Sequence, residues 1–304
     1  MSDNAAPIQL APLRVLATLR TGKHQLTLDP HNRICYSAGV IKKIHYCWLG
    51  SEIPAHVRAH VQSWQRLCPD YDYFEWNNSN ASYPEHRYWQ QAASSKRWAF
   101  ASGVVQLRKL YEHGGFYLDC DVVILKPLDK IPAPSDHLIM GYMYDCALSG
   151  GFLYSPPGHP LVAKMLEYYD DINPGFFAVN NTILTDCINN NVADFLLNGK
   201  FFQSEEHKLT IFPKEYFCHP SLLPGKSFIV DLFSGSWKSP SDTYKLADYR
   251  LSLIRALRRK VSCYRALCRN EYLDIYKQAR KGIKELRMEY WRQKYGITGG
   301  AIKL

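Results

Sequence analysis

The stretch LYEHGGFYLDCDVVILKPL, residues 110–128, decides the fold that the sequence predicts. Its first residues continue a helical pattern, which the glycine pair at 114–115 brings to an end. The apolar run that follows predicts a short buried strand, and this strand leads directly into Asp119-Cys120-Asp121. A helix, a glycine turn and a strand with a polar end are typical of folds in which strands and helices alternate.

The same alternation continues on both sides of this stretch. Residues 41–50 are rich in β-branched and aromatic residues and stop at a glycine, as a strand that runs into a loop would. Helical spacing is present at 54–67, 98–113 and 161–169, and strands are expected at 71–76, 122–125, 138–144 and 151–154. We therefore predict an α/β fold with a mixed or parallel Rossmann-type sheet and flanking helices.

We predict three parts along the chain. Residues 1–40 read as an irregular N-terminal extension, with a hairpin around Asp29-Pro30-His31-Asn32. Residues 41–240 form the α/β domain, whose last portion, from 171, is mixed and loop-rich. In residues 241–304, apolar positions recur every three or four residues, which predicts a basic amphipathic helix or helix pair that packs on the domain.

The positive charge of the chain is concentrated in this C-terminal extension. The formal net charge is +9, yet Lys245 to Lys294 alone holds 15 Lys and Arg against 5 Asp and Glu, so the rest is nearly neutral. One helical face carries Arg255, Arg258, Arg259, Arg265 and Arg269. This face fits an anionic membrane surface or is simply solvated. A nucleic-acid partner is not expected, because the aromatic residues lie on the apolar stripe and not among the arginines.

Composition excludes several classes of protein. At 46% hydrophobic residues the chain is not disordered, and no apolar run approaches the roughly 18 residues that would span a bilayer. The first twenty residues lack the apolar stretch of a secretory signal. Nine cysteines without a CxxC pair or zinc spacing predict reduced thiols. These features predict a cytoplasmic protein, either free or peripheral on the inner face of the membrane.

Asp119 and Asp121 are the residues with the clearest chemistry. Two carboxylates one residue apart at a strand end can share a divalent cation, and Mg²⁺ or Mn²⁺ on such oxygen ligands can bridge a diphosphate. Ligands of open α/β sheets bind at the carboxyl ends of strands, where this pair falls. Two alternatives remain open. The triplet can be a solvated turn, or it can be the DxD motif of a phosphohydrolase with Asp119 as nucleophile and Asp170-Asp171 as the downstream acidic pair.

Several segments of the chain form a set: IKKIHYCWLG (41–50), SWQRLCPDYDYFEWNNSN (63–80), KRWAFAS (96–102), LYEHGGFYLDCDVVILKPL (110–128) and, more weakly, LSGGFLYSPPGHP (148–160), IFPKEYFCHP (211–220) and SGSW (234–237). Together they resemble the DXD-containing sugar transferases of glycosyltransferase family 32. That family includes capsule and lipopolysaccharide enzymes and is distantly similar to the large clostridial glucosylating toxins. The resemblance implies a GT-A-like fold, a nucleotide-sugar donor, Mn²⁺ or Mg²⁺ as cofactor, and hexosyl transfer to a glycan or lipid-linked acceptor with retention of configuration.

The resemblance also implies roles for individual residues. Trp48 matches the aromatic residue that stacks on the donor base, although from its spacing alone it could equally be a core residue. Asn80 matches a residue near the nucleoside, with a turn residue as the alternative. The remaining implied roles are these: Asp119 faces the ribose and the sugar, Asp121 ligates the metal directly, and Ser236 and Trp237 close over the diphosphate. Asp119, Asp121 and Trp237 are thus the implied catalytic residues.

This chain departs from the family pattern at three positions. The family motif SDxxR, whose residues bind the donor, begins here at Ser102. Gly103 replaces its Asp, and Gln106 replaces its Arg. Loss of the Arg removes a full charge and a forked donor from the phosphate site. Asp231 stands where the family usually has a histidine as third metal ligand, and its oxygens can still ligate. These departures leave open a second function, that of a weak or non-catalytic relative that binds nucleotides or glycans.

Overall fold

The computed structural model describes residues 20–21, 24–28, 34–37, 39–144, 147–173, 175, 177–178, 180–219 and 226–231. The chain separates into two compact units, residues 1–39 and 40–304. In the first unit, β1 (Arg20–Thr21), β2 (His24–Leu28) and β3 (Ile34–Ser37) form an antiparallel sheet. Leu28 pairs with Ile34, so the predicted hairpin connects β2 to β3. The predicted C-terminal helices lie outside the described residues.

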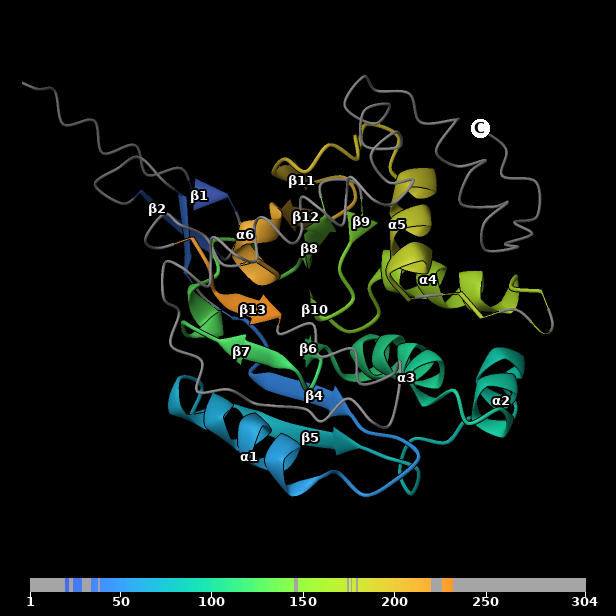
Figure 1. Ribbon diagram of the computed structural model, residues 1–304. Coiled ribbons are helices and arrows are strands. Elements are labelled where there is room, and N and C mark those ends of the chain that lie inside the picture. Colours follow the sequence, from blue (N-terminus) through green and yellow to red (C-terminus); the bar gives the residue numbers. More distant parts are fainter. Residues whose placement is uncertain are drawn as a thin grey trace, which may run out of the picture. The chain divides into compact units, whose positions relative to one another are not determined.

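The second unit is built on an eight-stranded mixed sheet (Figure 1). Its strands are β4 (Lys43–Cys47), β5 (Asp72–Trp76), β6 (Gly115–Leu118), β8 (Leu138–Tyr144), β9 (Ala147–Leu148), β10 (Phe152–Ser155), β11 (Phe202–Ser204) and β12 (Leu209–Phe212). The order is β11-β12-β8-β10-β6-β4-β5, and β9 pairs with β8. β4 is parallel to β5 and β6, and β12 to β8, whereas the other neighbours are antiparallel. The predicted α/β class, with a mixed sheet and flanking helices, is confirmed.

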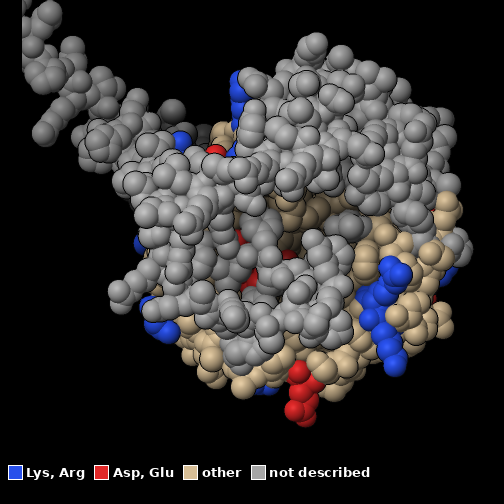
Figure 2. All heavy atoms as spheres, in the orientation of Figure 1, with Lys and Arg blue, Asp and Glu red and all other residues tan. Residues whose placement is uncertain are grey.

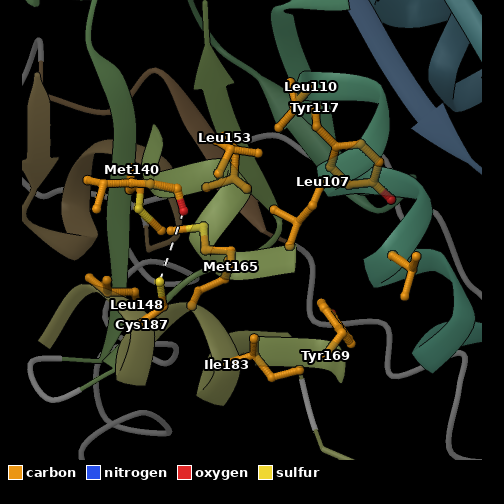
Figure 3. Close-up of a cluster of buried hydrophobic side chains, with 14 of the residues drawn as sticks. Leu107, Leu110, Tyr117, Met140, Leu148, Leu153, Met165, Tyr169, Ile183 and Cys187 are labelled. Atoms are coloured by element: carbon orange, nitrogen blue, oxygen red, sulfur yellow. Dashed lines mark hydrogen bonds between the residues drawn. The ribbon is translucent and has the colours of Figure 1, made fainter. Parts of the chain in front are cut away.

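Helices cover both faces of this sheet. One face packs against α2 (Arg87–Ser94), α3 (Trp98–His113), α4 (Pro160–Asp170) and α5 (Asn180–Asn191). The other packs against α1 (Ala55–Ser63), the 3₁₀ turns η1 (Trp64–Arg66) and η2 (Leu128–Lys130), α6 (Lys214–Phe217) and a two-stranded sheet of β7 (Val122–Ile124) and β13 (Ile229–Asp231). Successive side chains of a strand point to opposite faces, so Tyr117 enters one core while Phe116 and Leu118 enter the other. Figure 3 shows the first core, where Leu107, Met165 and Ile183 meet the sheet.

The strand order changes direction at β4. β5 and β6 lie on opposite sides of β4 and are both parallel to it, so the carboxyl ends of all three strands share one edge. Ligands of open α/β sheets bind where the strand order reverses in this way. Trp48 follows β4 at this edge and Asp119 follows β6, which puts the two segments singled out from the sequence side by side.

Three helices were not predicted from the sequence: α2, α5 and the short α6. α2 falls in a stretch that we left unassigned, and α5 falls in the region that we expected to be loop-rich. The sequence of α5, NNTILTDCINNN, is dominated by residues of weak helix propensity. Burial of Ile183, Leu184 and Ile188 in the core overrides that propensity. By contrast, α3 and β8 have the bounds predicted for them.

Two expectations about cysteines and membrane spans can be compared with the described residues. Among the described residues, Cys47, Cys68, Cys120, Cys187 and Cys218 are free thiols and form no disulfide with one another. Within the same part, no helix combines the length and the apolar character that crossing a membrane requires.

Candidate functional site

Three acidic residues approach one another beside the carboxyl end of β6. Asp119 and Asp121 lie between β6 and β7, and the antiparallel pairing of β13 with β7 sets Asp231 opposite Val122. A Cβ atom added to Gly151 would lie 3.3 Å from Asp119 Oδ2 and 3.6 Å from Asp231 Oδ2. The two carboxylates therefore face the same small space above Gly151. In Figure 2, acidic atoms are visible in the region where Figure 1 places β6, β7 and β13.

The electrostatics of Asp119 are those of a buried carboxyl group beside a second negative charge. Burial and the nearby negative charge of Asp121 raise the pKa of Asp119 to about 8, although a hydrogen bond with the Tyr117 side chain opposes the shift. Asp231 is buried, at 7% exposure. A cation between these oxygens would oppose both causes of the raised pKa, because a positive charge nearby favours the ionised carboxylate.

The residues present fit a cation that is shared with a substrate rather than one enclosed by protein. Among the described residues, no group of three or more His, Cys, Asp or Glu side chains is close enough to hold a metal ion. Mg²⁺ is usually bound by only one or two carboxylates, with substrate phosphates and water completing its shell. The facing oxygens of Asp119 and Asp231, with Asp121 beside them, meet this requirement.

The backbone around these carboxylates is fixed from both sides. The Asp119 N–H donates to the Gly151 carbonyl at 3.0 Å. On the other side, the Val122 carbonyl accepts from His60 Nε2 at 2.6 Å and from Trp64 Nε1 at 3.0 Å. His60 belongs to α1 and Trp64 to η1. The helical segment after β4 therefore holds the backbone that carries the acidic pair through two hydrogen bonds. Sequence reasoning missed both residues, because a buried His and Trp look like ordinary core residues.

The residues expected at the nucleoside, Trp48 and Asn80, follow the carboxyl ends of β4 and β5. Trp48 is partly buried against the second core, and its backbone N–H donates to the Trp76 carbonyl at 2.8 Å. Its indole Nε1 donates to Ser51 Oγ at 3.2 Å. Asn80 is exposed, and its side chain is used within its own turn: Oδ1 accepts from the Asn77 N–H and Nδ2 donates to the Glu75 carbonyl. This geometry is that of a turn residue, the alternative that we left open for Asn80.

The α3 residues of the SDxxR motif point in different directions. Ser102 is partly exposed, and its hydroxyl donates to the Ala99 carbonyl of its own helix at 3.0 Å. Gln106 is buried, at 2% exposure, and donates to the Gly150 carbonyl at 2.7 Å. Gly103 makes room for the Tyr169 hydroxyl, which a Cβ atom would meet at 2.2 Å. Gln106 thus contacts the chain itself, in a place where the resemblance implies a donor ligand.

The remaining predicted residues lie either outside the described part of the chain or away from the acidic site. Ser236 and Trp237 lie outside the described residues, so their place is not part of this geometry. Asp170 ends α4, and its carboxylate lies 3.6 Å from His86 Nε2. Gly151 and the Asn180-Asn181 pair were missed, although LSGG at 148–151 was among the segments that we quoted. The adjacent Gly150-Gly151 pair, repeated from 114–115, was the signal that could have singled out this turn.

Comparison with known proteins supports the chemistry of this edge. The model of a family described as "Glycosyltransferase sugar-binding region containing DXD motif" matches residues 54–138. A solved structure named "PaToxG Glycosyltransferase" is similar over 50% of this chain and 70% of its own, with 17% identity and a TM-score of 0.43. A comparison with curated proteins gave no match. The matched residues span α1 to the start of β8 and include both Asp119 and Asp121, so this part of the chain is similar to the DXD sugar-binding region of glycosyltransferases.

Proposed function

We propose that this glycosyltransferase uses a divalent cation, Mn²⁺ or Mg²⁺, to move a hexose from a nucleoside diphosphate sugar to a glycan or lipid-linked acceptor, with retention of configuration. The observation that carries the proposal is the convergence of Asp119 and Asp231 on the space above Gly151, beside Asp121. Acidic oxygens that face one another at the carboxyl end of β6 favour a cation together with a diphosphate, because neither carboxylate could bind a phosphate alone.

In this proposal each residue has a defined task. Asp119, Asp121 and Asp231 hold the cation, and Asp119 also faces the ribose and the sugar. When bound, the cation neutralises the charge that develops on the leaving diphosphate. The indole of Trp48 stacks on the base, since it is fixed by Ser51 at one edge and remains partly exposed. Trp237, with Ser236, closes the site and excludes water, which limits hydrolysis of the donor.

A weak or non-catalytic relative is the second candidate, and one observation favours it. Gln106 is turned into the protein, with both ends of its amide engaged, so it supplies no charge to a donor phosphate. A protein that kept the fold but lost this contact could bind a nucleotide without consuming it. Turnover, and not nucleotide binding, is therefore the quantity that separates the two candidates.

Contact with an anionic lipid surface is a proposal that rests on charge alone. The segment from Lys245 to Lys294 carries nearly all the net positive charge of the chain. Each basic residue near such a surface contributes about 1 kcal/mol of attraction, which screening by salt reduces. Sedimentation with anionic liposomes at low and high salt tests it. Binding that persists at 1 M salt, or no binding at low salt, would rule it out.

The decisive experiment measures donor consumption. The full chain is incubated with a panel of nucleotide sugars in Mn²⁺, and release of the nucleoside diphosphate is followed. We expect at least one donor to be consumed, EDTA to stop the reaction, and Asp121→Asn to abolish it. Glu167→Gln is the matched control, because it also neutralises a carboxylate but on the exposed side of α4, where Glu167 contacts only Lys164 among the interactions found. Full activity in EDTA contradicts the metal proposal, and nucleotide binding without consumption of any donor favours the second candidate.

A further inference from the structure

The turn at Gly150 is held by side chains on both of its backbone groups. The Gly150 N–H donates to Asn181 Oδ1 at 2.7 Å, and its carbonyl accepts from Gln106 Nε2 at 2.7 Å. A Cβ atom on Gly150 would lie 2.6 Å from Asn180 Nδ2, too close for any side chain. Side chains of α3 and α5 therefore hold this turn by hydrogen bonds, at a position where only glycine fits.

These two hydrogen bonds belong to a larger network of neutral polar groups. Asn180 Nδ2 donates to Gln106 Oε1 at 2.6 Å, and Asn180 Oδ1 accepts from the Tyr169 hydroxyl at 3.0 Å. Gln106 and Tyr169 are 2% and 1% exposed, so these bonds are made away from water. Both ends of the Gln106 amide have partners, and a fully satisfied buried network of this kind makes a structure rigid.

The far end of the network reaches the acidic site. Gly151 follows Gly150 directly, and the Gly151 carbonyl accepts a hydrogen bond from the Asp119 N–H at 3.0 Å. The Cα of Gly151 also faces both carboxylates, since its missing Cβ would lie within 4 Å of Asp119 Oδ2 and Asp231 Oδ2. A shift of the Gly150 backbone would thus be passed to the first residue of the DXD motif and to the space between the two carboxylates.

The departures from the SDxxR motif are part of the same arrangement. Gly103 leaves the space that the Tyr169 hydroxyl occupies, and that hydroxyl orients Asn180. Asn180 in turn donates to Gln106, which needs an acceptor oxygen at this place. An Arg at 106 would present only donors to Asn180 Nδ2 and would place a charge in a buried position. Gly103 and Gln106 are therefore matched to Tyr169 and Asn180.

We propose that Gln106, Asn180 and Asn181 are positioning residues that set the geometry of the Asp119 and Asp231 carboxylates for a divalent cation. The proposal rests on the metal-dependent function above and deepens it. These three side chains hold the Gly150 turn and act on the cation only through it. Outer residues that orient metal ligands typically change metal affinity 10- to 100-fold when they are replaced.

The test measures Mn²⁺ affinity directly, by the loss of the free-ion electron paramagnetic resonance signal on titration of the full chain. Gln106→Leu keeps the volume but removes both hydrogen bonds, and we expect its affinity to fall at least tenfold. Asn180→Ala should act in the same direction. Asn190→Ala is the matched control, because Asn190 also lies on α5 and also bonds a tyrosine hydroxyl, that of Tyr168 at 2.7 Å, but takes no part in the network. Circular dichroism melts show which variants are folded.

The outcomes separate this inference from the proposed function. Affinity within twofold of wild type in folded Gln106→Leu overturns it, as does an equal loss in Asn180→Ala and Asn190→Ala. Asn180→Ala decides alone if Gln106→Leu does not fold. A wild-type chain that fails to bind Mn²⁺ overturns the inference as well. If Mn²⁺ binds and the variants weaken it while no sugar donor is consumed, the positioning role stands and only the proposed transfer reaction fails.

Discussion

Replacing Gly103 by Ala should destabilise the protein, against the usual preference of helices. Alanine in a helix interior is favoured over glycine by about 1 kcal/mol. At Gly103, however, the new Cβ would lie 2.2 Å from Tyr169 Oη and 3.2 Å from its Cζ, and Tyr169 is 1% exposed. Overpacking costs about 1–3 kcal/mol, and a displaced hydroxyl that leaves Asn180 Oδ1 unpaired costs about 1–3 kcal/mol more. We therefore expect a net loss of about 1–5 kcal/mol.

Urea denaturation followed by circular dichroism measures this loss, provided that the denaturant slope is unchanged. Tyr169→Phe supplies the control, because it removes the oxygen that the new methyl group would strike and leaves the ring in place. Gly103→Ala in the Tyr169→Phe background should cost at least about 1 kcal/mol less than in the wild type, as expected for residues in direct contact. A Gly103→Ala variant as stable as the wild type, or more stable, would refute the close packing on which the network depends.

Three further predictions concern the site and its supports. Gly151→Ala should leave the melting temperature nearly unchanged but lower Mn²⁺ affinity about tenfold or more in a titration, because the methyl group would lie between Asp119 and Asp231; unchanged affinity would contradict the site. Burial lowers the pKa of His45 to about 4, so the stability that its neutral form contributes is present above pH 6.5 and should fall by about 2 kcal/mol between pH 7 and pH 5; in urea titrations His45→Gln should lose this part of the pH dependence. Trp48→Ala should weaken nucleoside diphosphate binding by about 1–3 kcal/mol in calorimetry, and unchanged affinity in the folded variant would make Trp48 a core residue.

The prediction for His45 follows from the two bonds of its ring. Its Nδ1 accepts from Trp76 Nε1 at 3.1 Å, so Nε2 carries the proton and donates to the Gly114 carbonyl at 2.9 Å. A second proton would set Nδ1–H against the indole N–H, and the ring would lose an acceptor that Trp76 needs. Gly114 ends α3 just before β6, so this histidine ties β4 to the turn that leads into the DXD motif.

Local patterns in the sequence were enough to predict much of the sheet but not the supports of the site. The glycine pair at 114–115, the apolar run after it and Asp119 are neighbours in the chain, and the strand between them is confirmed as β6. The bonds that hold Gly150 join residues 31 and 44 positions apart, and the Asn180 to Gln106 bond spans 74. Such pairings depend on how α3 and α5 pack on the sheet, and helical or strand periodicity carries no information about them.

The place of Gln106 could not be predicted for a different reason. The resemblance implied a residue that faces the donor, and the loss of an Arg therefore read as a loss of function. With Gln106 turned toward Gly150, the position has instead become part of the protein interior. A diphosphate at this edge would meet Asp119, Asp121 and the buried Asp231 with no guanidinium from position 106 to offset them. In the proposed function the cation supplies the positive charge that offsets the two phosphates, so donor binding depends on the geometry of its ligands and hence on the network behind Gly150.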